Sequence, residues 1–136
     1  MIKTVKQVCL LVAAGWLAAC SPQPQAGVYA AEASAAADGR DAVWGLYTYG
    51  HEVSVFAPCG GTQDFWADGG EAVMKPLQEA SMRLAESRNM PYQAVLARLY
   101  ISEPVQAAEG FPADYDAAVT VKAVADVLPD RQSCPE

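Results

Sequence analysis

The chain has 136 residues, of which nine are Lys or Arg and 16 are Asp or Glu, and its formal net charge is −7. This length suits one folded domain and not two. An acidic protein repels phosphate backbones and anionic headgroups, which argues against nucleic acid as a partner and favours cationic proteins.

Residues 1–19 have the pattern of an export signal. Lys3 and Lys6 give a positive start, and an apolar run from Val8 to Ala19 follows. A run of about twelve residues is too short to cross a bilayer, which takes roughly twenty, but it is typical of a signal sequence.

The signal ends in Leu17-Ala18-Ala19-Cys20, which resembles the lipobox of bacterial lipoproteins. The resemblance implies cleavage before Cys20 and diacylation of its thiol, and two acyl chains anchor a protein stably where one does not. Ser21 stands where Asp would favour retention in the inner membrane of enteric-type bacteria. We therefore expect a lipid anchor in the outer membrane and a domain in the periplasm. An ordinary signal peptide is the alternative.

Residues 20–41 are expected to form a lipidated, flexible tether. Ser21 to Gln25 is rich in Pro and Gln, an Ala-rich stretch follows, and no sustained apolar period is present. A flexible segment of about twenty residues has an end-to-end distance of roughly 25 Å, enough to hold a domain clear of the membrane. A short helix over 30–37 is the alternative, because Ala favours helix.

Residues 42–136 are expected to form the globular domain, which begins with three strands. β-branched and aromatic residues predict strands over 43–49, 52–57 and 62–67. Gly50-His51 suits a two-residue type II′ turn between the first two strands. Asp68-Gly69-Gly70 is expected to end the third.

One helix is predicted over 71–89. Its apolar stripe consists of Val73, Leu77, Ala80 and Leu84. Pro76 must lie in the first turn or kink the helix, so the regular part is expected to begin near Met74 or Lys75. Asn89 is a plausible cap before Pro91.

Two further strands are predicted over 93–101 and 118–127, separated by a loop at 103–117. The residues of the last strand that alternation predicts to face inward are Val119, Val121, Ala123, Ala125 and Val127. The order β-β-β-α-β-β predicts a mainly β fold with one helix, a five-stranded OB-type Greek-key barrel. A generic α+β sandwich is the alternative.

Cys59 and Cys134 remain after Cys9 leaves with the signal and Cys20 takes the lipid. Two cysteines in an oxidising compartment most often form a disulfide. A metal or redox pair is the alternative, although neither cysteine lies in a C-x-x-C motif.

Residues 43–134 resemble the C-terminal OB-type domain of the NlpE family of outer-membrane lipoproteins. The matching positions are Gly45-Leu46-Tyr47, Gly50, Val55 to Cys59, Trp66, Leu99-Tyr100-Ile101, Tyr115-Asp116 and Cys134. The resemblance implies the barrel and an envelope location. Longer members carry an N-terminal barrel with a C-x-x-C motif that is linked to copper and stress signalling. No such motif stands here, so those roles are not carried over.

No catalytic or metal-binding arrangement is predicted. His51 is the one histidine and has no neighbours at ligand spacing. Met74, Met82 and Met90 are eight residues apart, which places them off a common helix face and favours packing over copper binding. Asp114 and Asp116 lack the Gly and Glu of a calcium loop. We therefore expect no enzyme activity and no cofactor.

Aromatic residues crowd the first three strands, on the side of an OB-type barrel that often binds ligands. The candidate partner-binding residues are Trp44, Tyr47, Tyr49, Phe65 and Trp66. Some must face the core, since the adjacent Phe65 and Trp66 point to opposite sides. The sequence thus predicts a lipid-anchored module that binds an envelope protein. The alternatives are an inhibitor of a cationic hydrolase such as lysozyme, with the 103–117 loop in its cleft, and a metal-binding or stress-related lipoprotein.

Overall fold

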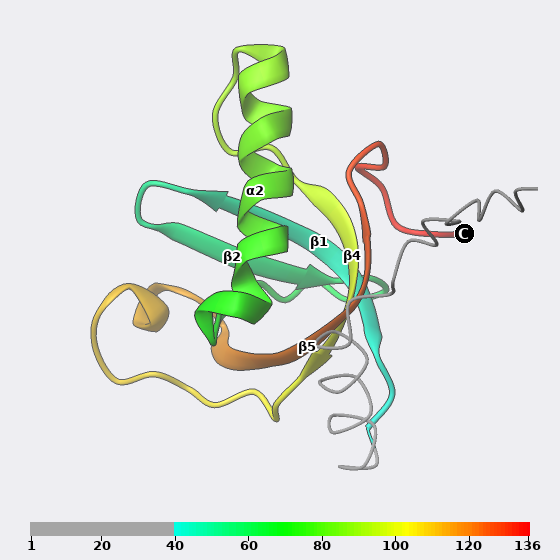
Figure 1. Cartoon of the computed structure of the whole chain (residues 1–136). Coiled ribbons are helices and arrows are strands. Elements are labelled where there is room, and N and C mark those ends of the chain that lie inside the picture. Colours follow the sequence, from blue (N-terminus) through cyan, green and yellow to red (C-terminus); the bar gives the residue numbers. More distant parts are fainter. Residues whose placement is uncertain (1–39) are drawn as a thin grey trace, which may run out of the picture.

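The computed structural model describes residues 40–136 (Figure 1). The predicted signal over 1–19, Cys20 and nearly all of the tether lie outside these described residues. The elements are β1 (Val43–Gly50), β2 (Val53–Pro58), β3 (Phe65–Gly69), α2 (Glu71–Arg88), β4 (Val95–Ile101), the 3₁₀ helix η1 (Phe111–Asp114) and β5 (Ala117–Leu128).

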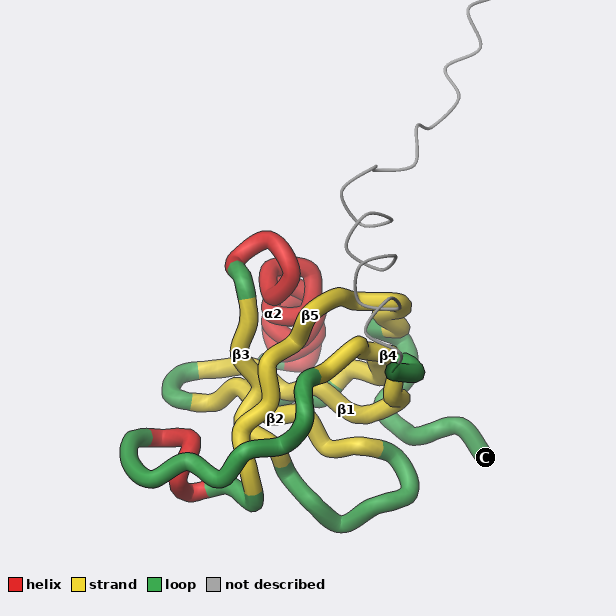
Figure 2. Tube along the Cα trace, turned by 90° about the horizontal axis from the view of Figure 1, so that it is seen from below, coloured by secondary structure: helices red, strands yellow, loops and turns green. Residues whose placement is uncertain are grey.

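The five strands form a closed barrel in the order β1-β2-β3-β5-β4 (Figure 2). β1 pairs antiparallel with both β2 and β4, and β5 pairs antiparallel with β4. β3 and β5 are parallel, with Phe65 opposite Ala117. This pairing, with one helix between the third and fourth strands, confirms the predicted OB-type Greek-key barrel.

The turn between β1 and β2 lies one residue later than predicted. Gly50 pairs with Val53, so His51 and Glu52 form the loop, and the positive φ of 57° is at Glu52. A type II′ turn has its positive φ at the first loop residue, so that prediction was wrong. Close packing requires glycine at position 50, because a Cβ there would lie 2.5 Å from Cε1 of Tyr92.

β3 starts and ends later than predicted, at Phe65–Gly69 instead of 62–67. Gly69 does not break the strand but pairs with Val121 across the parallel ladder. A Cβ on Gly69 would lie 2.6 Å from the Val121 carbonyl oxygen, so only glycine permits this close approach of the two strands.

β5 departs from simple alternation because its register with β4 shifts twice. One shift lies between Tyr100 and Ile101 of β4, and the other between Arg98 and Leu99. An extra residue at a bulge moves every later side chain to the other face. Val119 and Val121 are buried in the core as predicted, but Val124, predicted to face outward, packs against it.

Helix α2 begins at Glu71, three to four residues before the predicted start of its regular part. Pro76 therefore lies inside the helix, and the first turn swings away from the axis of the later turns (Figures 1 and 2). A proline inside a helix removes one hydrogen bond and favours such a bend. At the other end Asn89 adopts the left-handed conformation of a C-cap, as predicted.

The buried face of α2 closes the barrel core. Leu77 is fully buried, and Met74 is 3 % exposed. Ser81 is also fully buried, and its hydroxyl accepts a hydrogen bond from the Tyr49 N–H (2.9 Å) and donates one to the Gln93 carbonyl (2.6 Å). This one hydroxyl therefore ties the helix to the ends of β1 and β4.

Two further buried hydroxyl groups, those of Ser54 and Tyr47, form a hydrogen-bonded pair inside the barrel. Ser54 Oγ donates to the Ala67 carbonyl (2.6 Å), which leaves the Tyr47 hydroxyl to donate to Ser54 Oγ (3.0 Å). Burial raises the pKa of Tyr47 to about 12.

Tyr47 predicts a loss of stability at high pH. Between pH 10 and 12 the unfolded chain releases the phenolic proton and the folded chain keeps it, so the free energy of unfolding falls as pH rises, by about 3 kcal/mol in total. Tyr47→Phe should cost about 1 kcal/mol at pH 8 through the lost hydrogen bond. Urea unfolding across this pH range should show a flatter decline for Tyr47→Phe than for the native chain; parallel declines would contradict this account.

Cys59 and Cys134 form the predicted disulfide, with Cα atoms 5.7 Å apart and 75 residues of sequence separation. The bond joins the residue after β2 to the C-terminal tail. That tail also pairs with β4, because the Leu96 N–H donates to the Arg131 carbonyl (2.8 Å).

Candidate functional site

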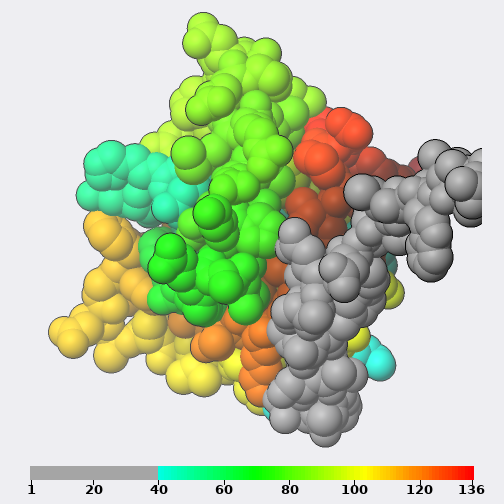
Figure 3. All heavy atoms as spheres, viewed as in Figure 1, coloured from blue at the N-terminus to red at the C-terminus, as the bar shows by residue number. Residues whose placement is uncertain are grey.

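A groove of about 450 Å³ opens on the β1–β2–β3 side of the barrel. Its lining includes Tyr49 of β1, His51 and Glu52 of the β1–β2 turn, Trp66 and Asp68 of β3, Gln78 of α2, and Phe111 of η1. The turn and the η1 segment lie side by side at the left of Figure 3, and these same two connections border the ligand site of many OB-type barrels.

An aromatic cluster forms one wall of this groove. The Trp66 and Phe111 rings are stacked with centroids 6.2 Å apart, and Tyr115 is tilted against Trp66 at 5.7 Å. Phe111 is 49 % exposed. Burial, with the charges of Asp114 and Asp64, raises the pKa of the Tyr115 phenol. The cluster thus presents large apolar rings to solvent next to a hollow surface.

One side-chain and one backbone hydrogen bond hold the end of the η1 segment against Asp64, the residue before β3. The Asp64 N–H donates to Oδ2 of Asp116 (2.8 Å), and the Asp116 N–H donates to the Asp64 carbonyl (3.1 Å). A bridge between Val105 and Ala118 holds the start of the segment. Phe111 therefore stands on a loop that is fastened at both ends, and the Asp116 side chain accepts one of the hydrogen bonds that fasten it.

The sequence around the groove is acidic. Residues 41–74 contain five acidic residues and no Lys or Arg, and residues 99–121 contain four and no Lys or Arg. These two stretches supply every lining residue except Gln78. The Asp68 carboxylate is oriented by the next residue of β3, because its Oδ1 accepts the Gly69 N–H (2.7 Å). The groove therefore favours cations over anions.

The structure divides the five predicted partner-binding aromatics among three places. Tyr47 (0 % exposed) and Phe65 (5 %) belong to the core, so they offer no surface to a partner. Trp44 lies under the guanidinium of Arg98, 5.5 Å from its ring centroid. Only Tyr49 and Trp66 line the groove.

Phe111 and Tyr115 were not among the predicted partner-binding residues, although the 103–117 loop that carries them was the expected cleft-binding loop of the inhibitor alternative. The sequence placed them in a long loop, and nothing local shows that this loop folds back onto Trp66. The rule that the last connection of an OB-type barrel borders its ligand site would have pointed to them.

Other candidate features show no site. Residues 40–136 hold no group of three or more His, Cys, Asp or Glu side chains placed to bind a metal, and no helix among them is long and apolar enough to cross a membrane. His51 is an exposed turn residue beside Glu52. Met74 packs in the core as expected, whereas Met82 and Met90 are exposed.

Fold and groove together define the class: a small disulfide-closed OB-type barrel with an acidic, aromatic groove at its usual ligand-binding side. Comparison of the chain with protein-family models, with curated proteins and with solved structures found no match.

Proposed function

We propose that the protein is a non-catalytic, lipid-anchored envelope protein whose barrel binds another protein in the periplasm. The anchor rests on the lipobox-like ending at Cys20. The binding role rests on one observation: Trp66 and Phe111 are stacked at the edge of a groove, and Phe111 remains half exposed. Aromatic residues in such places supply much of the binding energy of protein interfaces.

The arrangement favours binding because little order must be gained on association. Trp66 is part of a strand, and the Asp64–Asp116 hydrogen bonds hold the segment that carries Phe111. A surface that is already ordered loses less conformational entropy on association than a flexible loop would.

The resemblance to the NlpE family supports an envelope location but names no partner. An inhibitor of a cationic hydrolase such as lysozyme would be a special case of the same proposal. It would use the same groove and the same acidic segments. A metal-binding role is not proposed, because no cluster of ligands among residues 40–136 favours it.

The proposal predicts that Phe111→Ala abolishes partner capture. The test is a crosslinking pull-down of the full lipoprotein from its own membranes, with bound proteins identified by mass spectrometry. Removing a half-exposed anchor ring should weaken binding by about 2 kcal/mol or more, roughly thirty-fold, while the melting temperature stays nearly unchanged.

Met90→Ala is the matched control, because Met90 is a large apolar side chain with similar exposure (57 %) outside the groove. Capture lost in both variants would contradict the site. An absence of any specific protein with the native chain would contradict the binding function itself.

A further inference from the structure

The groove combines two carboxylates with an aromatic wall. Glu52 comes from the β1–β2 turn and Asp68 from β3, while Trp66 and Phe111 stand beside them. Among residues 40–136, His51 lines the groove and no Lys or Arg does. A ligand that enters therefore meets negative charge and ring faces together.

We propose that this groove takes the cationic side chain of an arginine or lysine from a basic segment of the partner. The inference rests on the proposed binding function and names the chemistry that the site recognises. Arginine fits best, since its planar guanidinium stacks on aromatic rings and binds carboxylates through two parallel hydrogen bonds.

The chain itself shows the same recognition at another place. Arg98 lies over the Trp44 ring at 5.5 Å, and its Nη2 lies 2.7 Å from Oδ2 of Asp126. Ring, cation and carboxylate therefore meet within the fold, although the buried Nε of Arg98 has no hydrogen-bond partner. In the groove the rings and the carboxylates of Glu52 and Asp68 are present, with His51 Nδ1 3.9 Å from Glu52 Oε1, and a ligand would supply the Arg or Lys.

Glu52 adds a further indication. Its φ of 57° is in the left-handed region, where Gly or Asn is favoured and a Glu costs stability. The turn nevertheless carries a carboxylate, which projects beside the groove with its side chain 58 % exposed. A carboxylate at a turn position that disfavours Glu is consistent with a role of Glu52 in binding.

Charge-matched peptides test this inference directly. The full chain, in a nonionic polyoxyethylene detergent, is titrated into a labelled twelve-residue peptide of Arg-Gly-Ser repeats and followed by fluorescence anisotropy. The matched probe replaces each Arg with citrulline, which keeps the shape and removes the charge. We expect the citrulline peptide to bind at least about ten-fold more weakly, and binding of the Arg peptide to weaken as salt rises.

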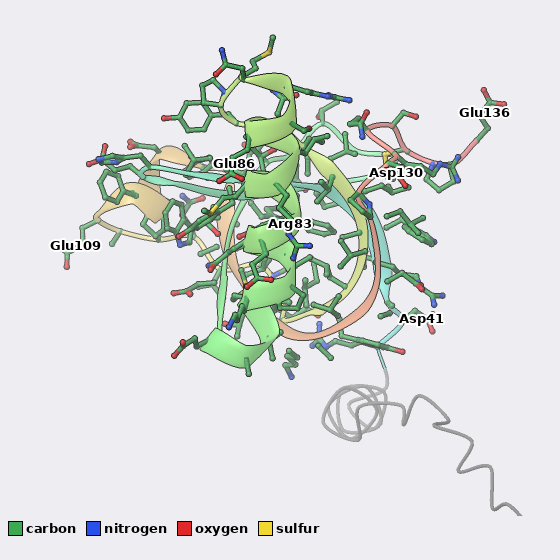
Figure 4. The ribbon with its side chains drawn as sticks, turned by 45° about the horizontal axis from the view of Figure 1, so that its top comes forward. Asp41, Arg83, Glu86, Glu109, Asp130 and Glu136 are labelled. Atoms are coloured by element: carbon green, nitrogen blue, oxygen red, sulfur yellow. A yellow bond between two sulfur atoms is a disulfide. The ribbon has the colours of Figure 1, made fainter. Side chains whose placement is uncertain are left out.

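Variants then locate the binding site. E52Q/D68N removes both groove charges and should weaken the Arg peptide about ten-fold at low salt. E86Q/D130N removes the same net charge elsewhere: Glu86 is on α2, and Asp130 lies on the side of the barrel opposite Glu109 (Figure 4). This control should change the affinity less than about two-fold.

Three results would overturn the inference: equal binding of the citrulline peptide, equal weakening by the two double variants, or salt-independent binding of an N-acetylglucosamine oligomer that displaces the Arg peptide. The last would mark the groove as a glycan site. A partner whose capture is lost in Phe111→Ala but kept in E52Q/D68N would leave the binding function intact and reject only the cationic ligand.

Discussion

Reduction of the Cys59–Cys134 disulfide should lower the free energy of unfolding by about 4–5 kcal/mol. The bond joins two residues that are 75 positions apart in the sequence. A crosslink over such a distance restricts the unfolded chain and thereby stabilises the folded state by about 4–5 kcal/mol. For a domain of this size the melting temperature should fall by more than about 15 °C. Urea unfolding with and without a reducing agent measures the difference.

The double variant Cys59→Ser/Cys134→Ser is the control for side effects of the reductant. It should unfold like the reduced native chain and should not respond to reduction. The hydrogen bond from Leu96 to Arg131 keeps the tail next to β4 in the folded state. A destabilisation below about 1 kcal/mol would therefore mean that the unfolded chain is already compact across this loop.

Replacement of Cys20 by Ser should remove the lipid and, with it, the anchoring of the protein in the outer membrane. Under the proposed lipid anchor, two acyl chains would supply nearly all of the membrane affinity, at about 0.8 kcal/mol for each buried CH₂ group, because anionic headgroups repel an acidic domain. Membrane fractionation, together with mass spectrometry of the N-terminus, follows the change. The native chain should carry lipid on its first residue.

The Cys20→Ser variant also separates the two readings of the leader. With a lipobox, the variant loses both its lipid and its cleavage site before residue 20. With an ordinary signal peptide, native and variant chains are equally water-soluble and are cut at the same place. Unfolding of the barrel should be the same in both chains, because Cys20 lies outside residues 40–136.

The sequence predicted the order of the elements because each strand and the helix has its own local pattern. The α2 side chains that pack in the core recur with the helical period. Those in the first half of β5 alternate as in a regular strand. Prediction failed where pairing between distant residues decides the outcome. The two register shifts of β5 against β4 bring Val124 to the core, and Gly69 continues β3 because Val121 comes so close.

The candidate site was only partly predictable for the same reason. Trp66 and Tyr49 could be placed near an OB-type ligand face, but alternation alone cannot separate surface rings from core rings when strands are aromatic throughout. Tyr47 became a core residue because Ser54 offers its hydroxyl a buried acceptor. Phe111 reaches the site through a contact with Trp66, 45 positions away, which no local pattern encodes.

Closure of the sheet would matter for a protein that is anchored at high density on a membrane. Pairing of β1 with β4 closes the barrel that residues 40–136 form. Lipid anchors concentrate copies of a protein in one plane, where an unpaired edge would invite strand addition and aggregation. Under the proposed lipid anchor, the closed barrels of neighbouring copies would offer one another few unpaired strand edges. We therefore expect a partner to be recognised through its side chains, which allows selective binding where proteins are crowded.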